Sequence, residues 1–456
     1  MNTTYKIYNP FDNELIDEFV YDTAQQVNEK VALLKQGRKT LRDIPAFKRS
    51  EILRRLAELL EEHAETLAEL ITRETGKTIS DSRVEMNRAI NAAIASAEEA
   101  RQISGEVLDS DAYSPARGKL GIVCWKPLGT VLCITPFNFP INIAIHKLAP
   151  AIAGGNTVLF KPGPQNTASA QLLTRLCYEA GIPEACLQLC MPDIPDMPSL
   201  VAHPDISCIN FTGGTATANA ISSAAGYKKL LLELGGNDPL IVMPDADLNA
   251  AADAAINQRF ATAGQRCTAA KRVFVHNEVF SAFRALLLEK TSKLKVGNPI
   301  EDDTFIGPVI NQKAANEIQA RIEDAIQHGA KLICGNQMDG CIVYPTILED
   351  VPYTCDLIKE ETFGPVIPLC KFTDIEEIVP IINSSAYGLQ AGIFTQNLAL
   401  SKYLYEELEV GTLAVNDGPG FRSEHFPFGG VKESGIGREG IKYAIREMSY
   451  LKTLVI

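Results

Sequence analysis

Short apolar runs with strand character alternate with longer helical stretches through the middle of this chain. Parallel strands need a long crossover, usually a helix, between one strand and the next. The alternation therefore predicts βαβ units and an α/β fold built on parallel sheets. The strand-like runs are 120–125, 130–134, 157–161, 208–212, 230–234 and 240–243, and the helices between them are 141–153, 168–180 and 215–225.

The same rhythm continues in the second half of the chain, whereas helices dominate its beginning. At roughly 150 residues per domain, the 456 residues predict about three structural units. We find no fixed repeat or long flexible linker in the sequence, so we expect these units to pack closely. The further elements predicted are helices 51–73, 81–103, 248–263, 279–294 and 312–328, an extended start, and strands 272–276 and 331–334.

Composition excludes several classes of protein. The chain carries 43 Lys and Arg against 56 Asp and Glu, so it lacks the basic face of a nucleic-acid-binding protein. The most apolar region, 130–160, is interrupted by Pro, Asn, His and Lys, so we expect no membrane association. Eleven scattered cysteines without a CxxC pair, and a start without an apolar secretory segment, indicate reduced thiols in a cytoplasmic protein. The six histidines show no spacing typical of a metal site.

Three local features carry chemistry. Cys267 directly follows Arg266, and an adjacent cation favours the thiolate, which is the nucleophilic form. Glu233 closes an apolar strand, where a carboxylate can act as a general base, although an ordinary strand-end Glu is the alternative. Gly213-Gly214 follows another strand and opens a helix, so backbone N–H groups there can face a phosphate. A glycine turn that serves packing alone is the alternative at this position.

Seven short segments occur in order along the chain, and together they resemble the NAD(P)-dependent aldehyde dehydrogenase superfamily. They are Thr135-Pro136-Phe137-Asn138-Phe139-Pro140, Lys161-Pro162, Phe211-Thr212-Gly213-Gly214, Glu233-Leu234-Gly235-Gly236, Gly264-Gln265-Arg266-Cys267, Glu361-Thr362-Phe363-Gly364-Pro365 and Pro427-Phe428-Gly429-Gly430. The resemblance covers essentially the whole chain. It implies an aldehyde dehydrogenase-like α/β fold with a Rossmann-type cofactor domain, an α/β catalytic domain and a small β oligomerisation element. The expected ranges are 1–110 and 130–232, 233–435, and 111–129 with 440–456, respectively.

The resemblance also implies a catalytic set and a cofactor set. Cys267 matches the nucleophile that forms a thiohemiacetal and then a thioester. Asn138 matches the amide that holds the oxyanion together with the backbone N–H of Cys267. Glu233 matches the base that activates water to hydrolyse the thioester. The residues that match the family's cofactor contacts are Thr135, Phe137, Lys161, Gly213, Gly214, Leu234, Glu361 and Phe363.

One departure from the family pattern bears on the cofactor. Many NAD-preferring relatives carry Glu three residues after the Lys, and this chain has Pro164 there. The carboxylate that would grip the ribose 2′-hydroxyl and repel a 2′-phosphate is therefore missing. Gly214 and Ala218 also replace a common Ser and a frequent Gly of the pyrophosphate turn. We expect NAD as the cofactor, with NADP as the alternative.

Three arginines indicate an anionic aldehyde as the substrate. Arg266, Arg422 and Arg88 resemble the arginines of the family branch that acts on sulfoacetaldehyde, phosphonoacetaldehyde or, without phosphorylation, glyceraldehyde 3-phosphate. Phe139 stands where relatives that handle phosphate esters often have Tyr or His, and the missing donor favours a monoanionic sulfonate. Sulfoacetaldehyde, oxidised to sulfoacetate, is thus the leading substrate. His425 lies between Arg422 and the Pro427 motif and is a further candidate contact.

Several alternatives stay open at this point. The alternative interpretation of Arg88 and Arg422 is that they form ion pairs on the surface and do not line an anion pocket. Phosphonoacetaldehyde, glyceraldehyde 3-phosphate, lactaldehyde and succinic semialdehyde are the alternative substrates. A CoA-acylating relative commonly lacks the Glu base and a non-catalytic descendant would lose the nucleophile, but both Glu233 and Cys267 are present. The partly apolar end, 449–456, would leave an exposed strand edge in a monomer, which predicts a homodimer or homotetramer.

Overall fold

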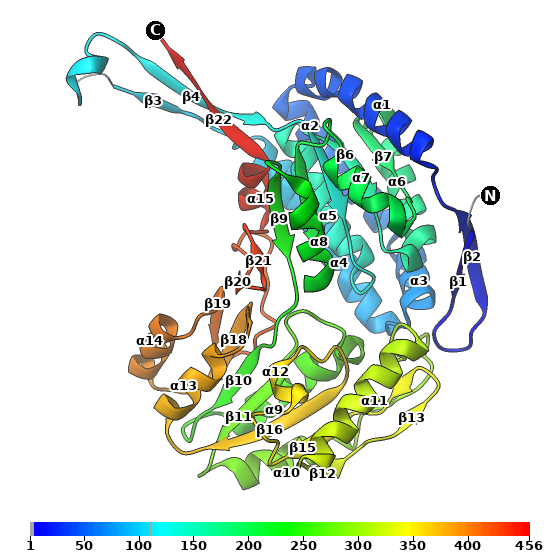
Figure 1. Ribbon diagram of the computed structural model, residues 1–456, viewed down its shortest axis with the longest axis vertical. Helices are drawn as coiled ribbons and strands as arrows, with labels where there is room; N and C mark the ends of the chain where they lie inside the picture. The colour runs from blue at the N-terminus through cyan, green and yellow to red at the C-terminus, as the bar shows by residue number, and fades with distance from the viewer. Residues whose placement is uncertain (1–3, 110–111) are drawn as a thin grey trace.

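Two large β-sheets with their helices, a projecting arm and three short strand pairs make up the computed structural model, which describes residues 4–109 and 112–456 (Figure 1). The first sheet and its helices form the upper body of Figure 1, and the second sheet forms the lower body. Residues 1–3 and 110–111 fall in the ranges predicted for the cofactor domain and the oligomerisation element, and they lie outside the described residues.

The first sheet is parallel except at one edge. Its order is β21 (Gly435–Ile436), β9 (Lys229–Glu233), β8 (Cys208–Thr212), β5 (Thr130–Ile134), β6 (Thr157–Lys161) and β7 (Leu187–Leu189), and β21 is the antiparallel strand. Side chains alternate along β5, so Val131 and Cys133 join one core cluster while Leu132 and Ile134 join another. The helices of the first cluster are α2 (Ala46–Glu62), α3 (Ala64–Thr75), α4 (Ile79–Ala100), α5 (Pro140–Gly154), α6 (Thr167–Glu179) and α15 (Ile441–Glu447), and those of the second are α1 (Ala24–Asp43), α7 (Met197–Ala202) and α8 (Thr215–Ala225).

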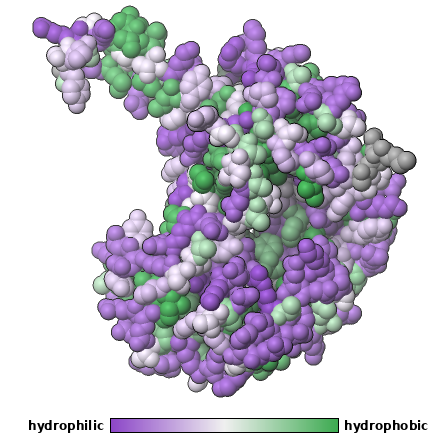
Figure 2. Space-filling model, in the orientation of Figure 1, coloured by the Kyte–Doolittle hydropathy of each residue, from purple (hydrophilic) through white to green (hydrophobic). Residues whose placement is uncertain are grey.

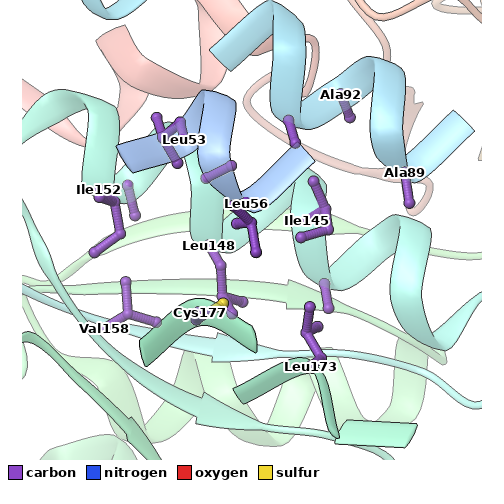
Figure 3. Packing of buried hydrophobic residues seen from close by; sticks show 14 of the residues in the cluster. Leu53, Leu56, Ala89, Ala92, Ile145, Leu148, Ile152, Val158, Leu173 and Cys177 are labelled. Atoms are coloured by element: carbon purple, nitrogen blue, oxygen red, sulfur yellow. The ribbon is translucent and has the colours of Figure 1, made fainter. Parts of the chain in front are cut away.

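The larger core cluster of this sheet fixes helices α4 and α5 against each other. In Figure 3, Leu56 of α2, Ala89 of α4, Ile145 of α5 and Leu173 of α6 point into one buried cluster. The alanines of α4 allow a close approach, and α4 packs directly on α5. Helix α4 carries the predicted site residue Arg88, and α5 directly follows Asn138 and Phe139, so the packing of these helices sets the geometry of the candidate site.

The second sheet is parallel except for one edge strand. Its order is β12 (Lys331–Cys334), β15 (Thr346–Glu349), β16 (Val366–Phe372), β11 (Arg272–His276), β10 (Pro239–Val242), β18 (Gln390–Phe394) and β19 (Thr412–Val415), and β12 is antiparallel. Its core includes side chains from α9 (Leu248–Phe260), α10 (Phe280–Thr291), α11 (Gln312–Gln327), α12 (Asp356–Lys359), α13 (Ile375–Asn383) and α14 (Leu398–Glu407).

A three-stranded arm projects from the first body (Figure 1). The last strand, β22 (Ser449–Val455), pairs antiparallel with β4 (Gly121–Pro127), which also pairs with β3 (Glu106–Leu108). Figure 2 shows hydrophobic residues gathered on this arm. The remaining short pairs are β1 (Thr4–Tyr8) with β2 (Leu15–Val20), β13 (Met338–Asp339) with β14 (Ile342–Val343), and β17 (Tyr387–Gly388) with β20 (Val431–Lys432).

The α/β fold class and most predicted elements are confirmed, and two predictions need correction. The helix predicted over 51–73 is two helices, because the chain turns at His63, and its predicted stop at Gly76 is confirmed by a left-handed backbone there. The run 120–125 belongs to the antiparallel arm rather than to a parallel βαβ unit, because its partner comes from the distant C-terminus. Among the described helices, none has the length and apolarity needed to cross a membrane.

Candidate active site

Cys267 follows a strained turn between α9 and β11. Thr262, Ala263 and Gly264 all have positive φ angles, of 54°, 51° and 73°. Such a conformation is costly for residues other than glycine and persists only where the surroundings hold it. At Gly264 a side chain is excluded, because a Cβ atom would lie 2.3 Å from the carbonyl oxygen of Gly364.

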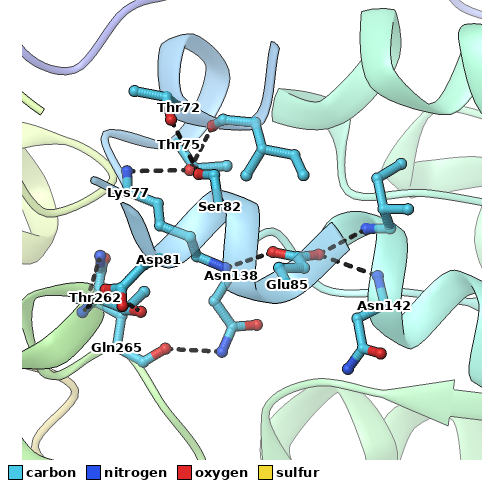
Figure 4. A network of polar contacts seen from close by, with 12 residues as sticks. Thr72, Thr75, Lys77, Asp81, Ser82, Glu85, Asn138, Asn142, Thr262 and Gln265 are labelled. Carbon is cyan, nitrogen blue, oxygen red and sulfur yellow. Dashed lines mark hydrogen bonds and ion pairs between the residues drawn. The ribbon is translucent and has the colours of Figure 1, made fainter. Parts of the chain in front are cut away.

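Asp81 of α4 holds this turn from the other body of the molecule (Figure 4). Its Oδ2 accepts hydrogen bonds from the Thr262 backbone N–H at 2.8 Å and from the Thr262 hydroxyl at 3.1 Å. Because α4 is buried in the first core, the Cys267 turn is tied to a rigid element.

Asn138 lies beside the backbone of the same segment. Its Nδ2 donates to the carbonyl oxygen of Gln265 at 2.7 Å, and Gln265 Oε1 in turn accepts from the backbone N–H of Ile310 at 2.9 Å. The carboxamide nitrogen carries two N–H groups, so one is left for a ligand oxygen. The structure thus brings together the predicted Asn138 and the segment that carries Cys267.

The start of α5, directly after Asn138, is anchored by a buried ion pair (Figure 4). Glu85 Oε1 accepts from the backbone N–H groups of Ile141 and Asn142 at 2.9 and 3.0 Å, and Glu85 Oε2 pairs with Lys77 at 2.5 Å. The Lys77 ammonium lies 3.7 Å from the centroid of the Phe139 ring, and the Arg266 guanidinium lies 6.0 Å from it. Phe139 therefore sits between two cations.

Glu233, at the end of β9, is buried next to Cys267. Neither carboxyl oxygen has a hydrogen-bond partner of standard geometry among the described residues. Burial, with a smaller contribution from the charge of Glu439, raises the pKa of Glu233 to about 8, although Arg422 and Lys147 oppose the rise. A carboxyl group with such a pKa can accept a proton and release it near neutral pH.

The thiol of Cys267 does not have the lowered pKa that the neighbouring Arg266 predicts. Burial raises the pKa of Cys267 well above its usual value, Glu233 adds to the rise, and Lys271 and Arg422 only partly offset it. The correction has a simple cause, since the cost of burying a thiolate exceeds the attraction of the cations nearby. A nucleophilic role for Cys267 would therefore need a base, and Glu233 is the carboxyl group whose charge acts on this thiol most strongly, ahead of Asp238.

A buried charge network that the sequence analysis missed lies behind Glu233. Glu439 pairs with Lys147 at 2.8 Å and with Arg422 at 2.6 Å, and Lys147 also donates to Asn210 Oδ1 at 2.7 Å. Burial opposes ionisation of Glu439, but Lys147 and Arg422 outweigh it and hold the pKa of this carboxyl well below its usual range. Arg422, predicted as a substrate contact, thus shares the single negative charge of Glu439 with Lys147.

Arg88 and Arg266 differ from Arg422 in keeping unpaired donors. Arg88 Nη2 and Arg266 Nε are buried without hydrogen-bond partners among the described residues. Burial lowers the pKa of Arg88 to about 10, and Arg422 and Arg266 contribute in the same direction. These guanidinium groups therefore lie close enough to repel one another, an arrangement that a bound anion would stabilise.

His425 lies on the surface. Its Nδ1 is 3.0 Å from the Ser423 hydroxyl, and its ring centroid is 4.6 Å from that of Phe426. The side chain is exposed, unlike the other predicted substrate residues. Within the described residues, we find no group of three His, Cys, Asp or Glu side chains that could hold a metal ion.

The turn between β8 and α8 fits a phosphate group. A Cβ atom at Gly214 would meet no atom of the described chain within 4 Å, so the space above this residue is open. Gly214 caps α8, and none of the described side chains forms a capping hydrogen bond there. The first N–H groups of the helix can therefore bind an anion. Nearby, Thr135 N–H donates to the carbonyl oxygen of Lys161 at 3.1 Å, which joins the ends of β5 and β6.

Glu361 and Phe363, which are predicted to contact the opposite end of the dinucleotide, lie in a second group of contacts. Glu361 accepts from Lys271 at 2.9 Å and from the Gly236 N–H at 3.2 Å. Lys271, which the sequence analysis missed, also donates to the carbonyl oxygen of Cys267 at 2.5 Å. Phe363 contacts Phe137 edge to face, with ring centroids 6.1 Å apart.

Two more predicted cofactor residues lie at strand ends. Leu234 is buried, and its backbone N–H donates to the carbonyl oxygen of Ser434 at 3.0 Å. Lys161 ends β6, its ammonium donates to the Pro162 carbonyl at 3.0 Å, and burial lowers its pKa. The residues present thus fit an NAD(P) dinucleotide at the carboxyl end of the first sheet, the usual ligand position in such sheets.

Comparison with known proteins places these features in context. The model of the family described as "Aldehyde dehydrogenase family" matches residues 1–454. A sulfoacetaldehyde dehydrogenase of Neptuniibacter caesariensis is 70% identical over 456 residues, which is 100% of both chains. A 3-sulfolactaldehyde dehydrogenase of Priestia aryabhattai is 38% identical, over 99% of this chain and 94% of its own. The crystal structure of glyceraldehyde-3-phosphate dehydrogenase GapN from Methanocaldococcus jannaschii, complexed with NADP, matches with a TM-score of 0.95 and 36% identity, over 99% of this chain and 98% of that one.

Proposed function

This chain belongs to the aldehyde dehydrogenase family and is an NAD(P)-dependent oxidoreductase, and from that premise we propose that it oxidises sulfoacetaldehyde to sulfoacetate. The observation that carries the proposal is the relative of that activity that is 70% identical over the full length of both chains. Arg88 and Arg266 each have a buried donor nitrogen without a partner among the described residues. They support an anionic substrate independently of the comparison with that relative.

The chemical step begins at Cys267. Its sulfur forms a bond to the aldehyde carbon while Glu233 accepts the thiol proton, directly or through one water. The carbonyl oxygen becomes an oxyanion and receives the free N–H of Asn138 and the backbone N–H of Cys267. Preorganised donors of this kind stabilise the charge that develops in the transition state.

The cofactor residues named above hold the dinucleotide, which when bound supplies the hydride acceptor for oxidation to the thioester. After the thiol proton has passed to solvent, Glu233 accepts a proton from a water molecule that attacks the thioester carbon. The C–S bond then breaks, the carboxylic acid is released and the Cys267 thiolate takes up a proton again. The pKa of about 8 at Glu233 suits both steps, because the group must gain and lose a proton in each cycle.

The charge inventory favours a sulfonate over a phosphonate or phosphate. Arg422 shares the charge of Glu439 with Lys147, and of the three predicted arginines Arg88 and Arg266 have buried donors without a partner among the described residues. Phe139 offers no further donor at the pocket. A monoanion is balanced by fewer cations than a dianion requires, which places phosphonoacetaldehyde and glyceraldehyde 3-phosphate second.

The cofactor preference and the assembly state are part of the same proposal. Pro164 leaves the 2′ position without a repelling carboxylate, so NAD and NADP are both accepted. The arm strand β22 leaves one edge unpaired and exposes apolar side chains, which supports a homodimer or homotetramer. The free state of all eleven cysteines supports a reducing, cytoplasmic location.

The test is a panel of initial rates with NAD and with NADP. The aldehydes are sulfoacetaldehyde, phosphonoacetaldehyde, glyceraldehyde 3-phosphate, lactaldehyde and succinic semialdehyde, each with and without added CoA. We expect the highest kcat/KM for sulfoacetaldehyde and free sulfoacetate as the product even when CoA is present. A higher kcat/KM for another aldehyde, or formation of an acyl-CoA, would overturn the proposal.

A further inference from the structure

His146 is a buried residue of α5 whose ring nitrogens form no hydrogen bond within the described chain. It is 1% exposed, and neither Nδ1 nor Nε2 has a hydrogen-bond partner among the described residues. Buried polar side-chain atoms nearly always have a partner, and leaving one without a partner is costly. The side chain therefore indicates a partner that binds from outside the chain.

The position of His146 on α5 directs it toward the candidate site. Asn142 lies one helical turn before it, on the same face, and Asn142 Oδ1 is likewise buried without a partner among the described residues. Asn138 lies just before the same end of the helix. Helical side chains generally lean toward the N-terminus of their helix, which is the end of α5 where Asn138 lies.

The groups that act on His146 come from three parts of the chain. Burial first, and then Arg422, Arg88 of α4 and Lys147 of its own helix, hold the pKa of His146 well below its usual value, while Glu439 opposes them. The ring is therefore neutral at physiological pH and carries one N–H donor and one acceptor nitrogen. Arg88 is also one of the arginines with a free buried donor.

We propose that His146 binds the anionic group of the substrate, donating its ring N–H to a sulfonate oxygen beside Arg88 and Arg266. This inference rests on the proposed function and names a specificity residue within it. A neutral donor satisfies an oxygen of the anion without adding a further cation to a pocket where the arginines already repel one another. Phe139 lacks the hydrogen-bond donor that Tyr or His often supplies at this position in relatives that handle phosphate esters. His146 would supply a donor in its place.

The test compares two substitutions at this position with two aldehydes. His146→Phe keeps a planar ring and removes the donor, whereas His146→Gln keeps an N–H donor in a similar volume. The substrates are sulfoacetaldehyde and propanal, which has no anionic group. We expect His146→Phe to raise KM for sulfoacetaldehyde roughly tenfold or more beyond any rise for propanal, and His146→Gln to recover most of the loss.

A matched control and a direct binding measurement keep the inference falsifiable. His276 is another buried histidine, but its Nε2 lies 2.8 Å from the Thr373 carbonyl oxygen, so His276→Phe reports the cost of losing a buried imidazole elsewhere. Ethanesulfonate should inhibit the wild-type enzyme competitively and inhibit the His146→Gln enzyme with a similar constant. If His146→Phe does not fold, His146→Leu replaces it. In either variant without a donor, the inhibition constant of ethanesulfonate should rise if His146 binds the sulfonate.

The outcomes separate this inference from the proposed function. An equal rise in KM for both aldehydes, or no rise for sulfoacetaldehyde, would show that His146 serves packing alone and would overturn the inference. A wild-type enzyme that does not prefer sulfoacetaldehyde would instead overturn the proposed function.

Discussion

Asp81 accepts two hydrogen bonds from Thr262, from its amide at 2.8 Å and from its hydroxyl at 3.1 Å, and so joins α4 to the turn before Cys267. That turn contains two left-handed residues other than glycine, Thr262 and Ala263. Each costs about 1–3 kcal/mol unless its surroundings hold it. The turn before Cys267 is therefore held by a residue 181 positions away from Thr262 in the chain.

Removing the hydrogen bonds between Asp81 and Thr262 should lower kcat more than it changes KM. We expect Asp81→Ala to lower kcat roughly ten- to a hundredfold with a smaller change in KM, because a shift of the turn misplaces the sulfur. Asp81→Asn keeps an acceptor oxygen and should recover part of the loss. The rate of alkylation of Cys267 by iodoacetamide should change in parallel. Asp302→Ala, which removes an exposed partner of Arg83, is the control, and wild-type alkylation in Asp81→Ala would refute the assignment.

The raised pKa of Glu233 predicts how the rate of thioester hydrolysis changes with pH. Its pKa is raised to about 8 by burial and by Glu439, and only the ionised carboxylate can accept a proton. The rate of thioester hydrolysis should therefore rise as pH increases toward about 8 and level off above it. Glu439→Gln removes a neighbouring negative charge, so the rise should shift to lower pH. A flat profile from pH 6 to about 9 in the wild-type enzyme would contradict this role.

Arg88 and Arg266 predict where substrate selectivity resides. Each has a buried donor nitrogen without a partner in the described chain, so each can bind an anion. We expect Arg266→Leu and Arg88→Leu to raise KM for sulfoacetaldehyde roughly tenfold or more beyond the rise for propanal. Arg83→Leu on the same helix as Arg88 is the matched control, because that arginine is exposed and pairs with Glu65. Equal effects on both aldehydes would remove the anion pocket.

The arm predicts the oligomeric state. Leu454 and Ile456 are 58% and 68% exposed, and strand β22 leaves one edge free. We expect the double substitution Leu454→Asp and Ile456→Asp to lower the mass measured by light scattering to that of one chain. Leu398→Asp is a control at an equally exposed leucine on α14. An unchanged mass in the double variant would show that the arm does not mediate assembly.

The fold followed from sequence where local pattern determines structure. The strands 130–134, 157–161 and 208–212 are observed at the predicted bounds, because apolar β-prone runs between helices have few other arrangements. The strand partners of the second sheet were less accessible: β16 and β18 were not predicted, since a buried parallel strand has no alternation to distinguish it. Pairing of β4 with the distant β22 is a tertiary property that no local window contains.

Some residues of the candidate site could likewise be predicted from the sequence, and others could not. Residues inside recognisable motifs, such as Cys267 and Asn138, could be named from the sequence, and the structure brings their segments together. Lys271, Glu439 and Asp81 could not, because each is a single polar residue whose importance comes from burial and from a partner far along the chain. The raised pKa of the Cys267 thiol also escaped the sequence, which shows the adjacent cation but not the burial.

The most direct test of the account is to locate the covalent intermediate. Glu233→Gln enzyme, in which thioester hydrolysis is slowed, is mixed with sulfoacetaldehyde and NAD or NADP at a pH high enough to ionise the Cys267 thiol without Glu233. The reaction is quenched with acid and digested, and the peptides of all eleven cysteines are measured by mass spectrometry. The account predicts a sulfoacetyl group on the peptide that contains Cys267. A sulfoacetyl group on another cysteine, or reduced cofactor formed without any modification of Cys267, would contradict it.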